Sequence, residues 1–408
     1  MPTPVASSSV GRSGSRCNHE YILAMQSVPV SGVSHRARVS GEQLSTERFG
    51  LDLVPLTRSS TILYFLATVL SGLLGEYPLV QSPFAPTVSV IMPTFNDTPW
   101  LSEALLSVQD QSFAGFECIV VDDGSTDDTS AVVREFSNRD SRFKYIRREH
   151  EGSPGTARNL GVDHAKGQIL VFHDSDDIAL PDRLARIVQM FNSKPDIGVV
   201  YHDYLVFDHN NPSDESRYFK ARYDTPAGLI FKELYAVNLH ITASASVLTK
   251  WYSHFGGQKS RSEIALGEDF EFFLRISPKV PCAYIDAPLL RVRRRKPNHL
   301  SGDLPRSIES RLRALDDFEN LYPELKSELS AIRSTTRGHF LFSLGRAHLW
   351  RGNDSNACRA FQKAFNTTPS FRVFAYLGAS TLGIGRFLRL LRTVRYGICP
   401  PDSKLKLY

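Results

Sequence analysis

The sequence contains few cysteines: none of the five lies in a Cys-x-x-Cys pair or at a zinc-binding spacing from histidine. An odd and scattered set points to a reducing compartment rather than a disulfide framework. Cys118 lies within an apolar run, so we expect it to be a small core residue. Long, repeated hydrophobic runs are also missing, which disfavours a polymerase that extrudes its product through many membrane spans.

Residues 1–86 differ in composition from the rest and are predicted to be an N-terminal extension that is largely disordered. They contain one uncharged apolar stretch, residues 59–75, which is short for a spanning helix and diluted by Ser, Thr and Gly. We expect a peripheral or packed helix there, and the stretch lies too far from the start to be an ordinary signal peptide. A start codon assigned too far upstream would also explain this composition.

The charge excess is small and uneven. The net charge is +5, and the segment from Phe371 to the end is strongly basic, because it holds one acid, Asp402, and seven lysines and arginines. A basic stripe on a folded domain would favour nucleic acid, which we do not expect as a partner. A basic and apolar tail fits an anionic membrane surface better. We therefore expect a cytoplasmic protein with peripheral contact to the inner face of the membrane.

From Thr87 onward, apolar strand patterns alternate with helical patterns at the spacing of βαβ units. This alternation predicts an α/β fold in which helices flank a mostly parallel sheet. Pro93 is expected to end the first strand. The strands are expected at residues 88–92, 116–121, 143–147 and 169–172, and the helices at 100–109, from about 129, at 156–165 and at 181–191.

Two clusters of acids follow predicted strands: Asp122-Asp123, and Asp174-Ser175-Asp176-Asp177. The ends of parallel strands are where such sheets bind polar ligands. A turn and helix cap is the plainer reading of the first cluster, and it suits Ser125 and Asp127.

In the second cluster, the alternation of an extended chain points Asp174 and Asp176 the same way. Neighbouring carboxylates repel each other unless a cation separates them, and Mg²⁺ or Mn²⁺ suits oxygen ligands. A solvated acidic loop is the alternative, and Asp177 is expected to cap the next helix or to orient its neighbours.

Five motifs then occur in order: Pro93-Thr-Phe-Asn96, Val121-Asp-Asp-Gly-Ser-Thr-Asp127, Gly155-Thr-Ala-Arg-Asn-Leu-Gly161, Asp174-Ser-Asp-Asp177 and Gly267-Glu-Asp269. Together they resemble the inverting, nucleotide-sugar-dependent glycosyltransferases of family two, which have the GT-A fold. The resemblance covers about residues 87–302, which we take as the catalytic domain.

The resemblance implies roles for individual residues. Asp269 would be the general base, with Glu268 as the second candidate, although acids at a helix N-terminus are also stabilised by the helix dipole. Asp176 and Asp174 would hold Mn²⁺ or Mg²⁺, with Asp174 leaning toward the ribose. The remaining nucleotide-sugar contacts would be Pro93, Thr94, Asn96, Asp122, Asp123, Arg158, Asn159, Ser175, Arg294 and His299. For Arg158, a surface side chain is the alternative.

Residues 303–408 are predicted to be an α-helical region. The segment from about residue 338 to 371 fits a single tetratricopeptide-like repeat, with His348 in place of the usual aromatic residue. One repeat cannot bury its own apolar face, so we expect it to pack on the catalytic domain or on the next helix. A basic amphipathic segment follows, in the tail from Phe371.

The predicted function is transfer of a sugar from a nucleotide sugar, expected to be a UDP-sugar, to a hydroxyl acceptor with inversion. The acceptor would be a glycan, a lipid-linked glycan or a protein, in the synthesis of cell-surface glycans or glycoconjugates. The alternative is a noncatalytic sugar-nucleotide-binding or scaffold protein on the same fold. The sequence does not specify the donor sugar, since few pocket side chains decide it.

Overall fold

The computed structural model describes residues 86–218, 225–237, 241, 243–294 and 303–381. The chain divides into two compact units, Met1–Phe65 and Leu66–Tyr408, and all described residues belong to the second. The apolar stretch 59–75, His299 and the basic segment after residue 381 lie outside the described residues. Within the described part, no helix is both long and apolar enough to cross a membrane.

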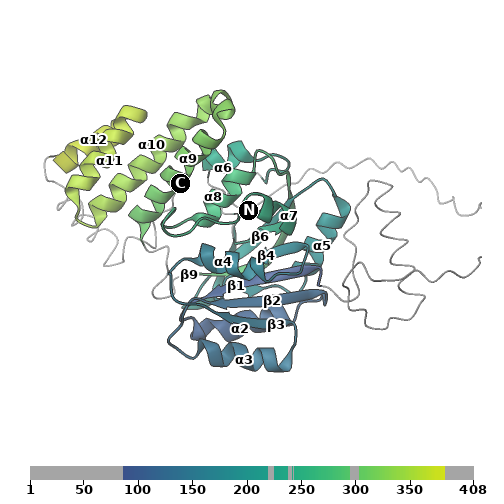
Figure 1. Ribbon diagram of the computed structural model, residues 1–408. Coiled ribbons are helices and arrows are strands. Elements are labelled where there is room, and N and C mark those ends of the chain that lie inside the picture. Colours follow the sequence, from purple (N-terminus) through teal and green to yellow (C-terminus); the bar gives the residue numbers. More distant parts are fainter. Residues whose placement is uncertain (1–85, 219–224, 238–240, 242, 295–302, 382–408) are drawn as a thin grey trace, which may run out of the picture. The chain divides into compact units, whose positions relative to one another are not determined.

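The described strands form one sheet of nine strands in the order β3-β2-β1-β4-β8-β6-β9-β5, with β7 paired to β6 (Figure 1). Strands β3, β2, β1 and β4 run parallel, β8 reverses direction, and β6 and β9 are again parallel to each other. The sheet is therefore mixed, and its parallel part is the predicted βαβ region. The strands are β1 Val88–Thr94, β2 Phe116–Asp122, β3 Phe143–Arg147, β4 Ile169–Phe172, β5 Ile178–Ala179, β6 Val199–Asp208, β7 Asn211–Arg217, β8 Ser246–Leu248 and β9 Cys282–Arg294.

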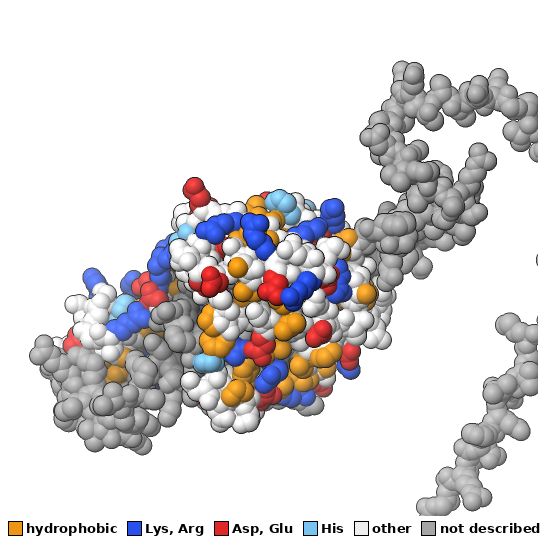
Figure 2. Space-filling view, turned by 90° about the horizontal axis from the view of Figure 1, so that it is seen from below, with side chains coloured by type: hydrophobic (Ala, Val, Ile, Leu, Met, Phe, Trp, Pro, Cys, Tyr) orange, Lys and Arg blue, Asp and Glu red, His pale blue; other side chains and the backbone are white. Residues whose placement is uncertain are grey.

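Alternating apolar side chains bury both faces of this sheet. In β1, Val88, Val90 and Met92 join one core, and Ile91 joins the other. The first core is covered by α2 Thr98–Gln109, α3 Thr129–Arg139 and α5 Arg183–Ser193. The second is covered by α4 Pro154–Asp163, α6 Phe231–Val237, α7 Thr249–His254 and α8 Glu268–Ile276. Cys118 is buried in the first core, as predicted. Figure 2 shows basic and acidic side chains interspersed over one outer face.

Pro93 does not end the first strand, which continues to Thr94 in register with Asp122. The prediction failed because Pro93 lacks an N–H only on the side of β1 that faces β4. Pairing with β4 stops at Ile91, whose carbonyl accepts from the amide of His173. Pairing with β2 is unaffected, so the strand continues. This extension places Thr94 beside the acids of β2.

The C-terminal region is helical, as predicted, with α9 Leu304–Leu321, the 3₁₀ turn Pro323–Leu325, α10 Lys326–Trp350, α11 Asp354–Thr367 and α12 Phe371–Thr381 (Figure 1). Gly345 of α10 lies against the ring of Phe361 in α11, and a Cβ there would approach that ring to 2.5 Å. The predicted repeat spans these two helices. Leu315, Phe318 and Phe340 share the core that covers the second face of the sheet.

Candidate functional site

The C-terminal ends of β1, β2 and β4 lie side by side and carry most of the predicted site residues. Thr94 and Asp122 are register partners, and the amide of Asp123 donates to the carbonyl of Thr94 at 2.9 Å. The next strand, β4, ends at Phe172 and leads directly into His173 and Asp174. This is the edge at which a parallel sheet presents polar side chains.

Asp122 is fully buried and has internal partners for both carboxylate oxygens. Oδ1 accepts from the amide of Ser125 at 2.7 Å, and Oδ2 accepts from the hydroxyl of Tyr145 at 2.6 Å. These bonds close the turn after β2 and fasten it to β3. Burial and Asp122 together raise the pKa of Tyr145. The structure thus gives Asp122 a structural use, of the kind expected for a turn residue.

Asp123 is also buried, and it organises the segment after β3. It accepts from Arg148 Nε at 2.6 Å and from the amide of Gly152 at 2.8 Å, and His150 Nδ1 lies 3.0 Å from it. The His150 ring stacks on Phe95 with centroids 4.1 Å apart. Phe95 is 40% exposed, so this pair forms an aromatic surface beside Asp123 that was not predicted from the sequence.

Thr94 and Asn96 occupy the turn between β1 and α2. Thr94 is 3% exposed, and its hydroxyl has no hydrogen-bond partner among the residues described. Asn96 adopts a left-handed backbone with φ 53°, which asparagine tolerates better than most residues. Its amide donates to Ser125 Oγ at 2.9 Å, and its Oδ1 accepts from the amide of Thr126 at 2.8 Å. Asn96 therefore links the two turns, and the Thr94 hydroxyl remains available at this edge.

The loop from Asp174 to Asp177 concentrates negative charge in a mostly buried place. Ser175 donates to Asp97 Oδ2 at 2.6 Å, which fixes the loop to the start of α2. Asp177 accepts from the amide of Arg293 at 3.0 Å. Burial and the neighbouring Asp176 and Asp174 raise the pKa of Asp177 well above its ordinary value. Loop acids therefore repel one another, as expected when carboxylates crowd together.

Asp177 does not cap the following helix. The residue before α5 is Asp182, which makes no side-chain capping bond, and Asp177 instead bonds the backbone of β9. The expectation of a cap was wrong because β5, Ile178–Ala179, intervenes between the acids and the helix. The alternative, that Asp177 orients its neighbours, agrees with the bond to Arg293.

Arg158 joins the acidic loop after β4 to the acids at the start of α8. Its Nη2 lies 2.9 Å from Asp174 Oδ1, and its Nη1 lies 3.1 Å from Glu268 Oε1. The side chain is buried, so the alternative of a surface arginine does not hold. Burial lowers its pKa, but Asp174, Glu268 and Asp269 outweigh this effect and raise it. One guanidinium thus brings the loop after β4 and the start of α8 together.

Asn159, the next residue, points its amide elsewhere. Nδ2 donates to the carbonyl of Gln258 at 2.7 Å, and Oδ1 accepts from the Tyr252 hydroxyl at 2.6 Å and from the amide of Gln258 at 3.0 Å. These contacts hold the segment that precedes α8. The described contacts therefore make Asn159 a support for the site.

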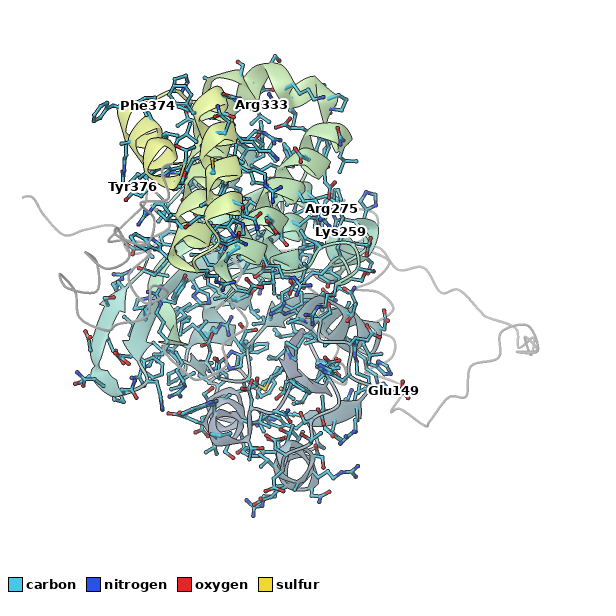
Figure 3. The ribbon with its side chains drawn as sticks, turned by 90° about the vertical axis from the view of Figure 1, so that its left-hand side faces the viewer. Glu149, Lys259, Arg275, Arg333, Phe374 and Tyr376 are labelled. Carbon is cyan, nitrogen blue, oxygen red and sulfur yellow. The ribbon has the colours of Figure 1, made fainter. Side chains whose placement is uncertain are left out.

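Helix α8 begins with the two candidate bases, in different surroundings. Glu268 is buried against Arg158, and burial followed by Asp269 raises its pKa. Asp269 is only partly buried in the first turn. Two side chains of α8 fasten the helix to the segment before it: Arg275 donates to the carbonyl of Gly257 at 2.7 Å, and Glu271 pairs with Lys259 as well as with Arg275. Figure 3 labels Arg275 and Lys259. Asp269 is therefore the more accessible carboxylate on a fixed helix.

The basic run at the end of β9 presents two neighbouring arginines differently. Arg294 is exposed, whereas Arg293 is buried, donates from Nε to the carbonyl of Asp176 at 3.0 Å and pairs with Glu103. The Arg293 guanidinium also lies over the rings of Trp100 and Phe207, each 4.7 Å away. Arg293 was not predicted from the sequence, because a run of arginines does not show which of them faces inward.

The fold and these acids define an α/β domain with polar side chains gathered at the ends of parallel strands. The family model described as "Glycosyl transferase family 2" matches residues 89–246. Residues 89–246 are therefore a family 2 glycosyltransferase domain, and the predicted resemblance and GT-A fold class are confirmed for this part of the chain.

Curated relatives match the same region. The chain is 40% identical over 108 residues to the GalNAc(5)-diNAcBac-PP-undecaprenol beta-1,3-glucosyltransferase of Campylobacter jejuni, covering 26% of this chain and 35% of that protein. It is 36% identical over 124 residues to UDP-Glc:alpha-D-GlcNAc-diphosphoundecaprenol beta-1,3-glucosyltransferase WfgD of Escherichia coli, covering 30% of this chain and 48% of that protein. The matches thus span less than half the length of either relative.

Solved structures are similar at low identity. TarS of S. aureus in complex with UDP-GlcNAc superimposes with a TM-score of 0.49 at 18% identity, covering 73% of this chain and 92% of that chain. The mannosyltransferase PcManGT of Pyrobaculum calidifontis, in complex with GDP-Man and Mn²⁺, superimposes with a TM-score of 0.46 at 18% identity, covering 82% and 92%.

Proposed function

We propose that this protein transfers a sugar from a nucleotide sugar to a hydroxyl acceptor with inversion. The observation that carries the proposal is the position of Arg158, which contacts Asp174 on the donor side and Glu268 on the helix of the candidate base. Acids from separate motifs thus share one buried partner. A displacement reaction needs these two sides close together, because the acceptor must attack opposite the leaving group.

The nucleotide would lie at the ends of β1 and β2. The exposed ring of Phe95, held by His150, offers a surface on which a base can stack. The buried hydroxyl of Thr94, which has no described partner, can bond the base or ribose. The backbone around Asp123 would form the rest of the nucleotide site, so we propose that Asp123 shapes this site. We propose a uridine diphosphate sugar as the donor, as the name of the Escherichia coli relative states for that protein.

A divalent cation would be held by Asp176 and Asp174, as the resemblance implies. Carboxylate oxygens suit Mg²⁺ and Mn²⁺. Burial, followed by Asp176 and Asp174, raises the pKa of Asp177, and a cation would offset the repulsion among these acids. When bound, the ion supplies positive charge to the departing diphosphate. The part of the chain described contains no group of three or more His, Cys, Asp or Glu side chains placed to hold a metal.

Asp269 would remove the proton from the acceptor hydroxyl. It is the more exposed of the two acids, and a base must reach the hydroxyl that it deprotonates. Glu268 is paired with Arg158, so we propose that Glu268 orients the start of α8. Attack on the anomeric carbon from the side of Asp269, with the diphosphate leaving on the side of Asp174, inverts that carbon.

The acceptor would be a lipid-linked glycan. The names of the Campylobacter and Escherichia relatives specify undecaprenol-linked acceptors for those proteins. The basic tail from Phe371 suits such a substrate, because it would bring the protein to an anionic membrane surface. The test is partitioning of the full chain and of a chain ending at residue 370 onto vesicles with and without anionic lipid, and equal partitioning would contradict tail-mediated binding.

The activity is tested with a panel of nucleotide sugars, with and without Mn²⁺. Asp269→Asn is expected to leave nucleotide binding nearly unchanged and to lower the rate of sugar transfer by a factor of about 10² or more. Glu268→Gln is the matched control, because it removes a neighbouring charge on the same helix and should affect transfer less. A fully active Asp269→Asn protein would show that the base is assigned wrongly. Tight nucleotide binding without turnover of any donor would favour the noncatalytic alternative.

A further inference from the structure

Arg183, the first residue of α5, is buried to 1% exposure although it carries a positive charge. Its described hydrogen-bond acceptors are all neutral. A buried cation paired only with neutral groups is costly, so such a residue needs a physical explanation. The acids at the end of β4 supply one: Asp177 and Asp174 attract this guanidinium, although burial still lowers its pKa to about 10.

The guanidinium of Arg183 ties together segments that are distant in sequence. Nε donates to His202 Nε2 at 3.1 Å, and Nη1 lies 2.9 Å from His173 Nδ1. Nη2 donates to the carbonyls of Phe172 at 3.1 Å and of Ala243 at 3.3 Å. Arg183 therefore joins the end of β4, the middle of β6 and the segment before β8.

His202 acts as a neutral acceptor in this arrangement. His202 Nδ1 lies 2.8 Å from the carbonyl of Asp203, so the proton belongs on Nδ1 and Nε2 is left to accept from Arg183. Burial, followed by the charge of Arg183, lowers the pKa of His202 well below its usual value. The positive charge therefore stays on the arginine.

The contacts of Arg183 fall on the two residues that immediately precede Asp174. Phe172 is the last residue of β4, and His173 connects it to the acidic loop. On the other side of the loop, Arg293 bonds the carbonyl of Asp176 and, through its amide, the carboxylate of Asp177. The loop is thus held at both ends by buried arginines.

We propose that Arg183 is a positioning residue for the acidic loop. It fixes the backbone before Asp174 and supplies a positive charge that attracts Asp177 and Asp174, so that Asp174 and Asp176 hold their arrangement before a divalent cation arrives. This rests on the proposed function, in which these acids hold the cation and the donor nucleotide. The sequence carries no sign of it, because Arg183 lies outside all five motifs of the resemblance.

The test measures Mn²⁺ binding to the full-length protein in the presence of UDP, by the electron paramagnetic resonance signal of free Mn²⁺. Arg183→Gln removes the charge and most donors, and should weaken Mn²⁺ binding by about 10- to 100-fold. Arg337→Gln is the matched control: it removes another largely buried guanidinium, from α10, and should change binding by less than about twofold. Unchanged binding by Arg183→Gln would overturn the proposal.

A second pair of variants applies if Arg183→Gln does not fold. His202→Leu removes one acceptor of Arg183, and should weaken Mn²⁺ binding by about 3- to 10-fold. His202→Gln restores an acceptor oxygen and should recover most of that loss. Wild-type binding by His202→Leu, or equal losses in both variants, would overturn the proposal.

Failure of the proposed function would give a different result: the wild-type protein would bind no Mn²⁺ with UDP, or Asp176→Ala would bind Mn²⁺ as well as wild type.

Discussion

The two acidic clusters look alike in sequence, but their carboxylates have different surroundings. Asp122 and Asp123 are buried and accept hydrogen bonds from their own turn and from the segment after β3. The loop from Asp174 to Asp177 gathers acids that repel one another, and buried arginines bond the backbone of Phe172 before it and of Asp176 within it. Acids with internal donors stabilise the fold. Crowded acids disfavour one another's ionised form and so oppose folding unless a cation separates them.

The largest expected effect is a loss of nucleotide binding, and it should be confined to the cluster from Asp174 to Asp177. Asp176→Ala should weaken UDP binding in Mn²⁺ by at least about 100-fold, because it removes a proposed metal ligand. It should leave the free energy of unfolding within about 1 kcal/mol of wild type, since the acids around it repel one another. Calorimetric titration with UDP, with and without Mn²⁺, checks the first part. Equal binding by variant and wild type would remove the functional side of the comparison.

The second effect belongs to the other cluster and is one of stability. Asp122→Ala should lower the free energy of unfolding by about 2–3 kcal/mol, because the Ser125 amide and the Tyr145 hydroxyl lose a buried charged acceptor. Urea unfolding measures it, with Asp127→Ala as control, since Asp127 makes comparable bonds near the surface. A loss no larger than that of the control would mean that the buried hydrogen bonds of Asp122 do not stabilise the fold.

Much of this could be predicted from the sequence, for physical reasons. The strands and helices between residues 88 and 191 alternate with clear apolar periods, and each expected element is present within a few residues. The mixed half of the sheet was not predicted, because β6, β8 and β9 pair across long sequence separations. Arg183 was not predicted because an isolated arginine in a sequence reads as a surface residue, and Arg293 was not predicted because a run of arginines does not show which of them faces inward. Only the folded chain shows these two to be buried beside the acids.

A carboxylate far from the site tests whether internal donors alone give the stabilising behaviour. Glu319 of α9 accepts from Tyr235, Arg333 and Arg337, and Arg333 is labelled in Figure 3. Burial opposes ionisation, but Arg333, Tyr235 and Arg337 lower the pKa of Glu319 to about 2. A carboxyl whose pKa is lowered by folding stabilises the folded state at pH values above its unfolded pKa, 4.5. This stabilisation is lost as the pH falls from 4.5 toward 2.

Glu319→Gln should therefore lower the free energy of unfolding by about 1–2 kcal/mol at pH 7. The difference from wild type should narrow below about pH 4.5, because Glu319 of the unfolded wild-type chain then binds a proton while the folded protein keeps the carboxylate ionised until the pH approaches 2. Urea unfolding at pH 7, 5 and 3.5 checks this. Glu324→Gln, in the 3₁₀ turn between α9 and α10, is the control. A difference between Glu319→Gln and wild type that is constant with pH would show that the charge of Glu319 is not what stabilises α9 against α10.

The smallest expected effect has the opposite sign and lies in the crowded cluster. Burial, Asp176 and Asp174 raise the pKa of Asp177, so its ionisation costs stability as the pH rises from the ordinary carboxyl range through the raised folded value. Asp177→Asn keeps an oxygen that can accept from the Arg293 amide and removes the charge. Without metal, the variant should gain about 1 kcal/mol in unfolding free energy at pH 7, and less at pH 4, where more of the wild-type carboxyl is protonated. Asp122→Asn should lose stability under the same conditions, because its carboxylate has strong donors. If both asparagine variants shifted the urea midpoint in the same direction, the two clusters would not differ in the way their contacts indicate.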